Sequence, residues 1–178
     1  MSDMVNEYDV TFAVKEWLLE HGWNVVAFNP PGAQGTFTIP NPSKDPAYRG
    51  QSGSESPDII AIKGASNVLI VESKPLFNQH DTQKLLNLKE NRSRMDVLVA
   101  LLEMVCKANN IPFKKPISVI LAKAHGGEDS LIMNMQTFLV STDKVWNPRK
   151  IDPSTNPYKF MKVLFIESNR AVGEIVKK

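Results

Sequence analysis

Two short apolar runs joined by a turn constrain the fold of this 178-residue chain more than any other feature. The runs cover residues 59–62 and 68–71, and both are rich in β-branched residues. Residues 64–67 between them (Gly-Ala-Ser-Asn) are typical of a tight turn. The sequence therefore predicts two antiparallel strands that form a hairpin.

Charged and polar residues stand at the open end of this hairpin. Asp58 precedes the first strand, and Glu72, Ser73 and Lys74 complete the second. Because side chains alternate along a strand, Glu72 and Lys74 project from one face and Ser73 from the other. The antiparallel return brings Asp58 opposite them. We therefore expect two carboxylates and an ammonium group to meet at one end of an otherwise apolar sheet, where isolated charges are costly to bury.

This arrangement favours a metal site. Two adjacent carboxylates repel each other unless a cation lies between them. Oxygen ligands with no Cys or His beside them suit Mg²⁺, for which Mn²⁺ can substitute. Such an ion keeps positions open for water and a phosphate group. Lys74 would then either orient and activate the attacking water or stabilise the charge that develops at phosphorus, which is the chemistry of a metal-dependent nuclease.

The residues Pro57-Asp58, and then Glu72-x-Lys74 at the end of the next apolar strand, resemble the motif of the PD-(D/E)xK nuclease superfamily. Its members include many restriction endonucleases and the archaeal Holliday junction resolvases. The resemblance implies an α/β fold with a restriction endonuclease-like core in the order αβββαβ, whose mixed central sheet is flanked by helices. It covers residues 5–124 of a single domain and implies a magnesium site on the second and third strands.

The resemblance also implies roles for individual residues. Asp58 and Glu72 would hold the metal ion, with a backbone oxygen of Val71 or Ser73 as a further ligand. Lys74 would position or deprotonate the water that attacks phosphorus, and cleavage would leave a 5′-phosphate. Because cutting both strands of DNA requires two active sites, we expect a homodimer, or a heteromer in which this chain cuts one strand.

A first helix is expected over residues 5–21, with Asn6 as its N-cap and Gly22 just beyond its end. Glu7 lies in line with the apolar stripe of this helix, and Glu20 lies at the edge of the stripe. In the resembled family an acid of the first helix often joins the metal site. Glu7 is the best candidate and Glu20 the second, although the helix dipole favours a first-turn acid in any protein.

The segment between the first strand and the motif is long and irregular. A strand is expected over residues 23–29, and residues 30–56 are rich in Pro, Gly, Ser and Asn. Long irregular segments inside a domain tend to be functional or mobile. Because this one directly precedes Asp58, it would reach over the site and offer Arg49 to DNA. A disordered loop is the alternative.

After Lys74, residues 81–110 show a helical pattern that predicts one long helix or two helices joined near Ser93. In the resembled family a polar residue of this helix supports the catalytic site. Gln83 and Lys84 are the candidates here, and both are also candidates for contact with DNA. A solvated helix face explains them equally well. Cys106 lies in an apolar part of the pattern, which favours a buried structural thiol over a nucleophile.

The last third of the chain adds further strands. Residues 116–124 form a continuous apolar run, which predicts a strand covered on both faces at the centre of the sheet. His125 then opens an expected turn, where it would act as a general base or touch a phosphate, although a lone loop histidine usually does neither. Strands are also expected over residues 137–141 and 160–167, within a C-terminal elaboration that spans residues 125–178.

Composition sets the remaining bounds. The chain is 42% hydrophobic and 22% charged, as is usual for a globular protein, and its single cysteine excludes an intrachain disulfide. No apolar run is long enough to cross a membrane, and the chain start lacks a secretory pattern, so we expect a cytoplasmic protein. The net charge is only +2, but basic residues gather after residue 143, where they would follow phosphates or simply keep this end soluble.

These observations together predict a Mg²⁺-dependent DNA endonuclease. The long segment before the motif and the extra C-terminal third favour a restriction-type enzyme, because both offer groups for reading bases. A Holliday junction resolvase or repair nuclease is the alternative within this class. A noncatalytic nucleic-acid-binding module on the same fold is the alternative from another class, since fold does not fix function.

Overall fold

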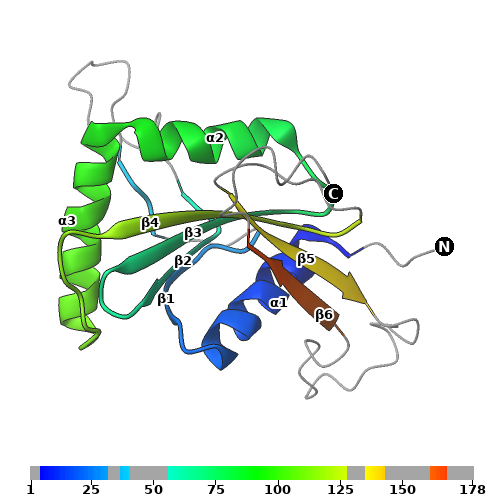
Figure 1. Ribbon diagram of the computed structural model, residues 1–178, viewed down its shortest axis with the longest axis horizontal. Coiled ribbons are helices and arrows are strands. Elements are labelled where there is room, and N and C mark those ends of the chain that lie inside the picture. Colours follow the sequence, from blue (N-terminus) through cyan, green and yellow to red (C-terminus); the bar gives the residue numbers. More distant parts are fainter. Residues whose placement is uncertain (1–4, 32–36, 41–55, 128–134, 143–160, 168–178) are drawn as a thin grey trace.

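The computed structural model describes residues 5–31, 37–40, 56–127, 135–142 and 161–167. In this part of the chain, three helices flank one six-stranded mixed sheet, which makes the structure α/β (Figure 1). The elements, in chain order, are α1 (Glu7–Glu20), β1 (Asn24–Phe28), β2 (Ile59–Lys63), β3 (Asn67–Lys74), α2 (Gln79–Glu90), α3 (Arg92–Ala108), β4 (Ser118–His125), β5 (Gln136–Thr142) and β6 (Met161–Ile166). No helix in the described ranges is long and apolar enough to span a membrane.

The strands lie in the sheet in the same order as in the chain, from β1 to β6. β1, β2 and β3 form an antiparallel meander, which confirms the expected hairpin. β4 runs parallel to β3, β5 runs parallel to β4, and β6 returns antiparallel to β5. Because parallel neighbours need a crossover, α2 and α3 fill the connection between β3 and β4. The continuous apolar strand β4 is central, as its composition predicts.

The tight turn between β2 and β3 is a three-residue loop, Gly64-Ala65-Ser66, between the paired residues Lys63 and Asn67. Gly64 and Ala65 have φ angles of 64° and 67°, and a left-handed backbone within such a short loop lets the chain reverse direction tightly. Ile59 pairs with Val71, and the register continues without a break to Lys63 opposite Asn67. The turn therefore fixes which residues face each other at the open end of the hairpin.

Asparagine side chains cap all three described helices. Asn6 accepts a hydrogen bond from the Asp9 N–H at the start of α1, as predicted. The helical pattern after Lys74 divides into two helices at Asn91, which ends α2 and caps α3 through the Arg94 N–H. The backbone of Asn91 is extended, with φ −82° and ψ 97°, so the helix axis changes direction there.

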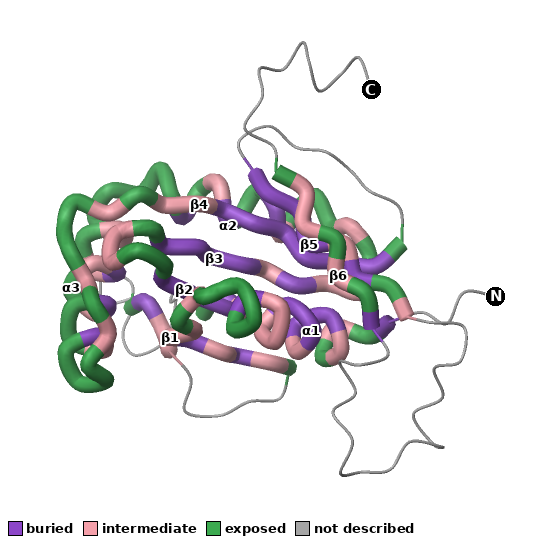
Figure 2. Tube along the Cα trace, turned by 60° about the horizontal axis from the view of Figure 1, so that its bottom comes forward, coloured by how far each residue is buried: buried purple, intermediate pink, exposed green. Residues whose placement is uncertain are grey.

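Apolar side chains form one core on each face of the sheet. α1 covers one face, and α2 and α3 cover the other (Figure 1). Buried runs lie along β2, β3 and the second half of β4 (Figure 2). Cys106 is fully buried in the core under α3, as expected of a structural thiol. The two cores hold β3 so that its last residues lie between the starts of α1 and α2.

Two sequence predictions about the rest of the chain can be compared with the structure. β5 and β6 confirm the strands expected in the last third. His125 is the last residue of β4 and is 1% exposed, so the predicted turn histidine was wrong. Gly126 and Gly127 follow a strand that stays buried to its end. Most of the 30–56 segment, Arg49 included, lies outside the described residues.

Candidate functional site

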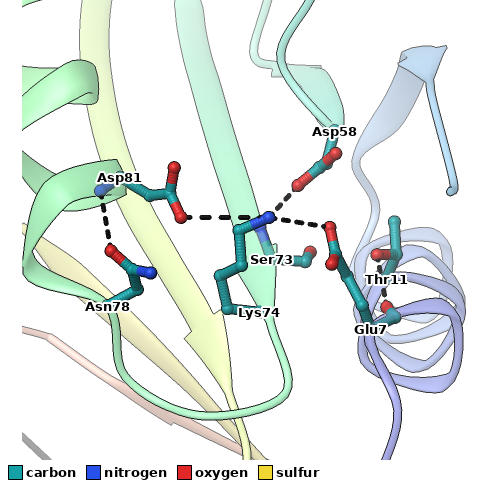
Figure 3. Close-up of polar contacts among 7 residues, drawn as sticks. All are labelled: Glu7, Thr11, Asp58, Ser73, Lys74, Asn78 and Asp81. Carbon is teal, nitrogen blue, oxygen red and sulfur yellow. Dashed lines mark hydrogen bonds and ion pairs between the residues drawn. The ribbon is translucent and has the colours of Figure 1, made fainter.

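The carboxyl groups of Asp58 and Glu72 face each other at the open end of the hairpin. One further step of the β2–β3 register puts Asp58 opposite Glu72, because Ile59 pairs with Val71. The two carboxyl groups hydrogen-bond with each other. Asp58 Oδ2 also accepts a hydrogen bond of 2.6 Å from the Ser73 N–H (Figure 3). The convergence that side-chain alternation predicts is therefore present in the structure.

Partial burial raises the pKa values of the two facing acids, Asp58 and Glu72. Burial raises the pKa of Glu72 to about 9, and the Asp58 charge and hydrogen bond act in the same direction. Burial likewise raises the pKa of Asp58, although the Ser73 N–H opposes this. In the absence of a cation, the pair therefore keeps a proton at neutral pH. A cation between the carboxyl groups would release that proton and stabilise both as carboxylates.

Two acids from different helices hold the ammonium group of Lys74. Its Nζ lies 3.1 Å from Glu7 Oε1 and 3.8 Å from Asp81 Oδ2 (Figure 3). Burial alone would lower the pKa of Lys74. The hydrogen bond to Glu7, with the negative charges of Glu7, Asp81 and Asp58, outweighs burial and raises the pKa of Lys74. Lys74 is therefore a fixed cation at neutral pH.

Only one of the two first-helix candidates lies at this end of the sheet. Glu7 is the first residue of α1, its charge raises the pKa of Asp58, and it binds Lys74. Glu20 is the last residue of α1 and is exposed. A helix rises 1.5 Å per residue, so the two acids are separated by about 20 Å. A role for Glu7 as a metal ligand stays a prediction.

The two α2 candidates point in different directions. The positive charge of Lys84 lowers the pKa of Glu72, which places the ammonium group within electrostatic reach of the carboxyl pair. Gln83 is exposed and donates a 3.0 Å hydrogen bond to Asn87 Oδ1 on its own helix. Of these two candidates, Lys84 is therefore the one that the structure brings to the site, and Gln83 lies away from it.

Ser73 presents its backbone to the site and its side chain to the opposite face. The Ser73 N–H donates a hydrogen bond to Asp58 Oδ2. In a β-strand, the N–H and the C=O of one residue point to the same side of the strand. The Ser73 carbonyl oxygen is therefore directed toward the Asp58 side of β3. Its hydroxyl oxygen is buried and has no hydrogen-bond partner among the described residues.

The available donors fit one hard divalent cation. Within the described ranges, no group of three or more His, Cys, Asp or Glu side chains is arranged to hold a metal ion. Mg²⁺, however, is usually bound through one or two carboxylates, keeps several waters and uses substrate phosphates as further ligands. Asp58 and Glu72, with the Ser73 carbonyl beside them, supply such a set.

Sequence reasoning missed two charged residues of this region. Asp81 lies in the first turn of α2, where its N–H donates a hydrogen bond to Oδ1 of the N-cap residue Asn78. Its carboxylate contacts the ammonium group of Lys74 (Figure 3). An asparagine followed three residues later by an acid is a weak indication of such a position. Lys123 is buried on β4 next to Glu72 in the strand register. One lysine inside an apolar strand was the available indication, because a buried ammonium group needs fixed partners.

A larger cavity lies at the other end of β4 and has a different character. Its volume is about 710 Å³, and residues around Ser118 and Leu69 line it together with Trp23 and Phe165. Lys89, Glu90 and Glu167 are its charged residues, and neither Asp58 nor Glu72 lines it. The chemistry is therefore concentrated at the Glu72 end of the sheet.

Comparisons with known protein families, with curated proteins and with solved structures give no match. The site itself must therefore carry any inference about function, because one fold supports many activities. Its main components are two facing carboxyl groups, a clamped lysine and the starts of two helices, and these come from segments far apart in the chain.

Proposed function

We propose that this chain is a Mg²⁺-dependent DNA endonuclease that hydrolyses phosphodiester bonds. The observation that carries the proposal is the half-buried Asp58–Glu72 pair, with Lys74 held beside it. Crowded carboxyl groups with raised pKa values are typical of functional sites, and hard oxygen ligands select Mg²⁺ or Mn²⁺. The PD-(D/E)xK motif and the order of the elements from α1 to β4, in which two helices follow the third strand, support the same assignment.

Each residue of the site has a distinct task in this proposal. Asp58 and Glu72 would hold the cation, with the Ser73 carbonyl as a further ligand. A bound divalent cation supplies a Lewis acid for the phosphoryl group and lowers the pKa of water. Lys74 is protonated, so it stabilises negative charge at phosphorus and orients water rather than removing a proton. Glu7 keeps this ammonium group in position.

Cleavage assays test this proposal directly. Plasmid, linear duplex, four-way junction DNA and RNA are incubated with the protein and Mg²⁺ or Mn²⁺, beside Asp58→Asn and Glu72→Gln. We expect metal-dependent cleavage of DNA that falls by about 10²–10³ in both variants, the usual effect of removing a group that organises transition-state charge. Asp96→Asn, an exposed acid of α3, is the matched control and should cleave normally. Absence of cleavage on every substrate would disprove the proposal.

A restriction-type activity is the proposed form of this function, because residues 30–56 and the residues after 125 add many polar groups to the sequence of the core. A junction resolvase or repair nuclease would share the same carboxyl pair. Double-strand cutting needs two sites, so we also propose a homodimer or a heteromer on DNA. Sedimentation with and without DNA measures this, and a monomer that still makes double-strand breaks would contradict it.

A noncatalytic nucleic-acid-binding module is the second candidate. It is favoured by the bond between Glu7 and Lys74, which occupies both groups, and by the lack of a three-acid group in the described part of the chain. Anisotropy of labelled DNA discriminates the two functions. DNA binding that persists in EDTA and in Glu72→Gln, with no cleavage in any metal, would establish the module.

A further inference from the structure

One lysine is buried beside the carboxyl pair. Lys123 on β4 is 4% exposed, whereas the other lysines of the described ranges are at least partly exposed. Transfer of an ammonium group out of water costs much free energy unless polar partners compensate it. The burial of Lys123 therefore requires fixed polar partners.

Two neighbours fix the orientation of the Lys123 side chain. Its Nζ lies 3.1 Å from His125 Nε2, and His125 Nδ1 lies 2.8 Å from the Gly126 carbonyl oxygen. Because a carbonyl only accepts, Nδ1 carries the ring proton and Nε2 accepts from Lys123. The Phe77 ring covers the ammonium group, with 5.2 Å from Nζ to the ring centroid, which is a cation–π distance.

The strand register extends the carboxyl pair into a row across three strands. Glu72 pairs with Lys123 in the parallel ladder, and Asp58 lies opposite Glu72 on the other side. Residues in register on neighbouring strands project from the same face. Glu72, Lys123 and His125 also line one cavity under the start of α2, where about 10 Å³ accepts the centre of a water molecule, which is room for one water.

We infer that Lys123 is the charge-balancing residue that limits the proposed site to one divalent ion. This inference rests on the proposed function and adds the number of ions to it. In two-ion sites the second ion lies about 3.5–4 Å from the first and needs further oxygen ligands. Here Glu7 of α1 and Asp81 of α2 both contact Lys74, on one side of the Asp58–Glu72 pair. On the other side, the neighbouring strand presents the ammonium group of Lys123 in place of an oxygen.

The number of bound ions and their affinity test this inference. The full chain is titrated with Mn²⁺ by calorimetry, with electron paramagnetic resonance to count bound ions. We expect one ion in the wild type and about tenfold tighter binding in Lys123→Met, because a nearby positive charge that repels the ion is lost. A proton competes for the same oxygens but carries half the charge of Mn²⁺, so the net change is tighter binding. A purely structural role would weaken binding instead.

Controls separate the possible outcomes. Lys114→Met, an exposed lysine near the hairpin turn, should bind Mn²⁺ like the wild type. Two ions in the wild type, or unchanged or weaker binding in a Lys123→Met that is folded by circular dichroism, would overturn the inference and leave the proposed function intact. No Mn²⁺ binding by the wild type would overturn both. If Lys123→Met does not fold, the ion count of the wild type decides, since one ion supports the inference and two refute it.

Discussion

Charged side chains are exposed to solvent at one end of the β2–β3 hairpin and partly buried at the other. At the turn end, Lys63 is exposed and its Nζ donates a 2.8 Å hydrogen bond to the His21 carbonyl oxygen. At the open end, Asp58 and Glu72 are half-buried against each other, and both pKa values are raised. The same two apolar strands carry both ends. A charged residue at a strand end is therefore not by itself a sign of function. Two like charges that the fold buries next to each other are such a sign.

The largest expected contrast is between the lysines at the two ends. Lys74→Met removes a cation that two acids hold beside the carboxyl pair, so DNA cleavage should fall by about 10²–10³. Lys63→Met removes an exposed cation and should leave the rate close to that of the wild type. Initial rates of plasmid nicking in Mg²⁺ measure both. Equal losses in the two variants would abolish the proposed difference between the ends.

The pH dependence of stability sharpens the comparison without any substrate. The pKa of Glu72 is about 9 in the folded chain and near 4.5 when unfolded, so the folded state binds more protons between these pH values. Without metal, the free energy of unfolding should therefore fall as pH rises, by on the order of 4 kcal/mol between pH 5 and 8. Urea denaturation in EDTA measures this change.

Glu72→Gln removes the titrating group and should flatten that pH profile. The double variant Lys63→Met with Asn67→Ala, at the turn end, should keep the wild-type slope, because no buried acid titrates there. A wild-type stability that rises over the same pH range would show that the carboxyl pair is not desolvated.

The smallest expected effect lies in the turn. Gly64 has a φ angle of 64°, which a residue with a Cβ adopts at a cost. Gly64→Ala should lower the free energy of unfolding by about 1 kcal/mol. Because the turn only connects the strands, Mn²⁺ affinity should not change. Denaturation and calorimetry check the two halves of this prediction, and a loss of Mn²⁺ binding would mean that the turn end contributes to the site.

The hairpin and the Asp58–Glu72 pair were predictable because they depend on local rules. Strand alternation and a short turn determine which residues face each other over a few positions. The same holds for Asn6, whose side chain caps α1 within one helical turn. Strand and helix types followed from apolar periodicity for the same reason.

Features that depend on packing between distant segments were not predictable. The choice of Lys84 over Gln83 depends on how α2 rotates on the sheet. The place of Lys123 beside Glu72 depends on the parallel register of β3 and β4, which the crossover through two helices separates in the chain. The position of His125 was also not predictable from local sequence. The two glycines after it indicated a turn, but in the structure His125 is the buried last residue of β4.

A diffraction experiment on Mn²⁺-soaked crystals tests the central claim most directly. The anomalous signal of Mn²⁺ should form one peak between the Asp58 and Glu72 carboxyl groups, with one oxygen of each at about 2.0–2.2 Å, the range for small hard cations. The direct hydrogen bond between the two groups should then be broken. A peak elsewhere, or none while that hydrogen bond persists at saturating Mn²⁺, would contradict the account.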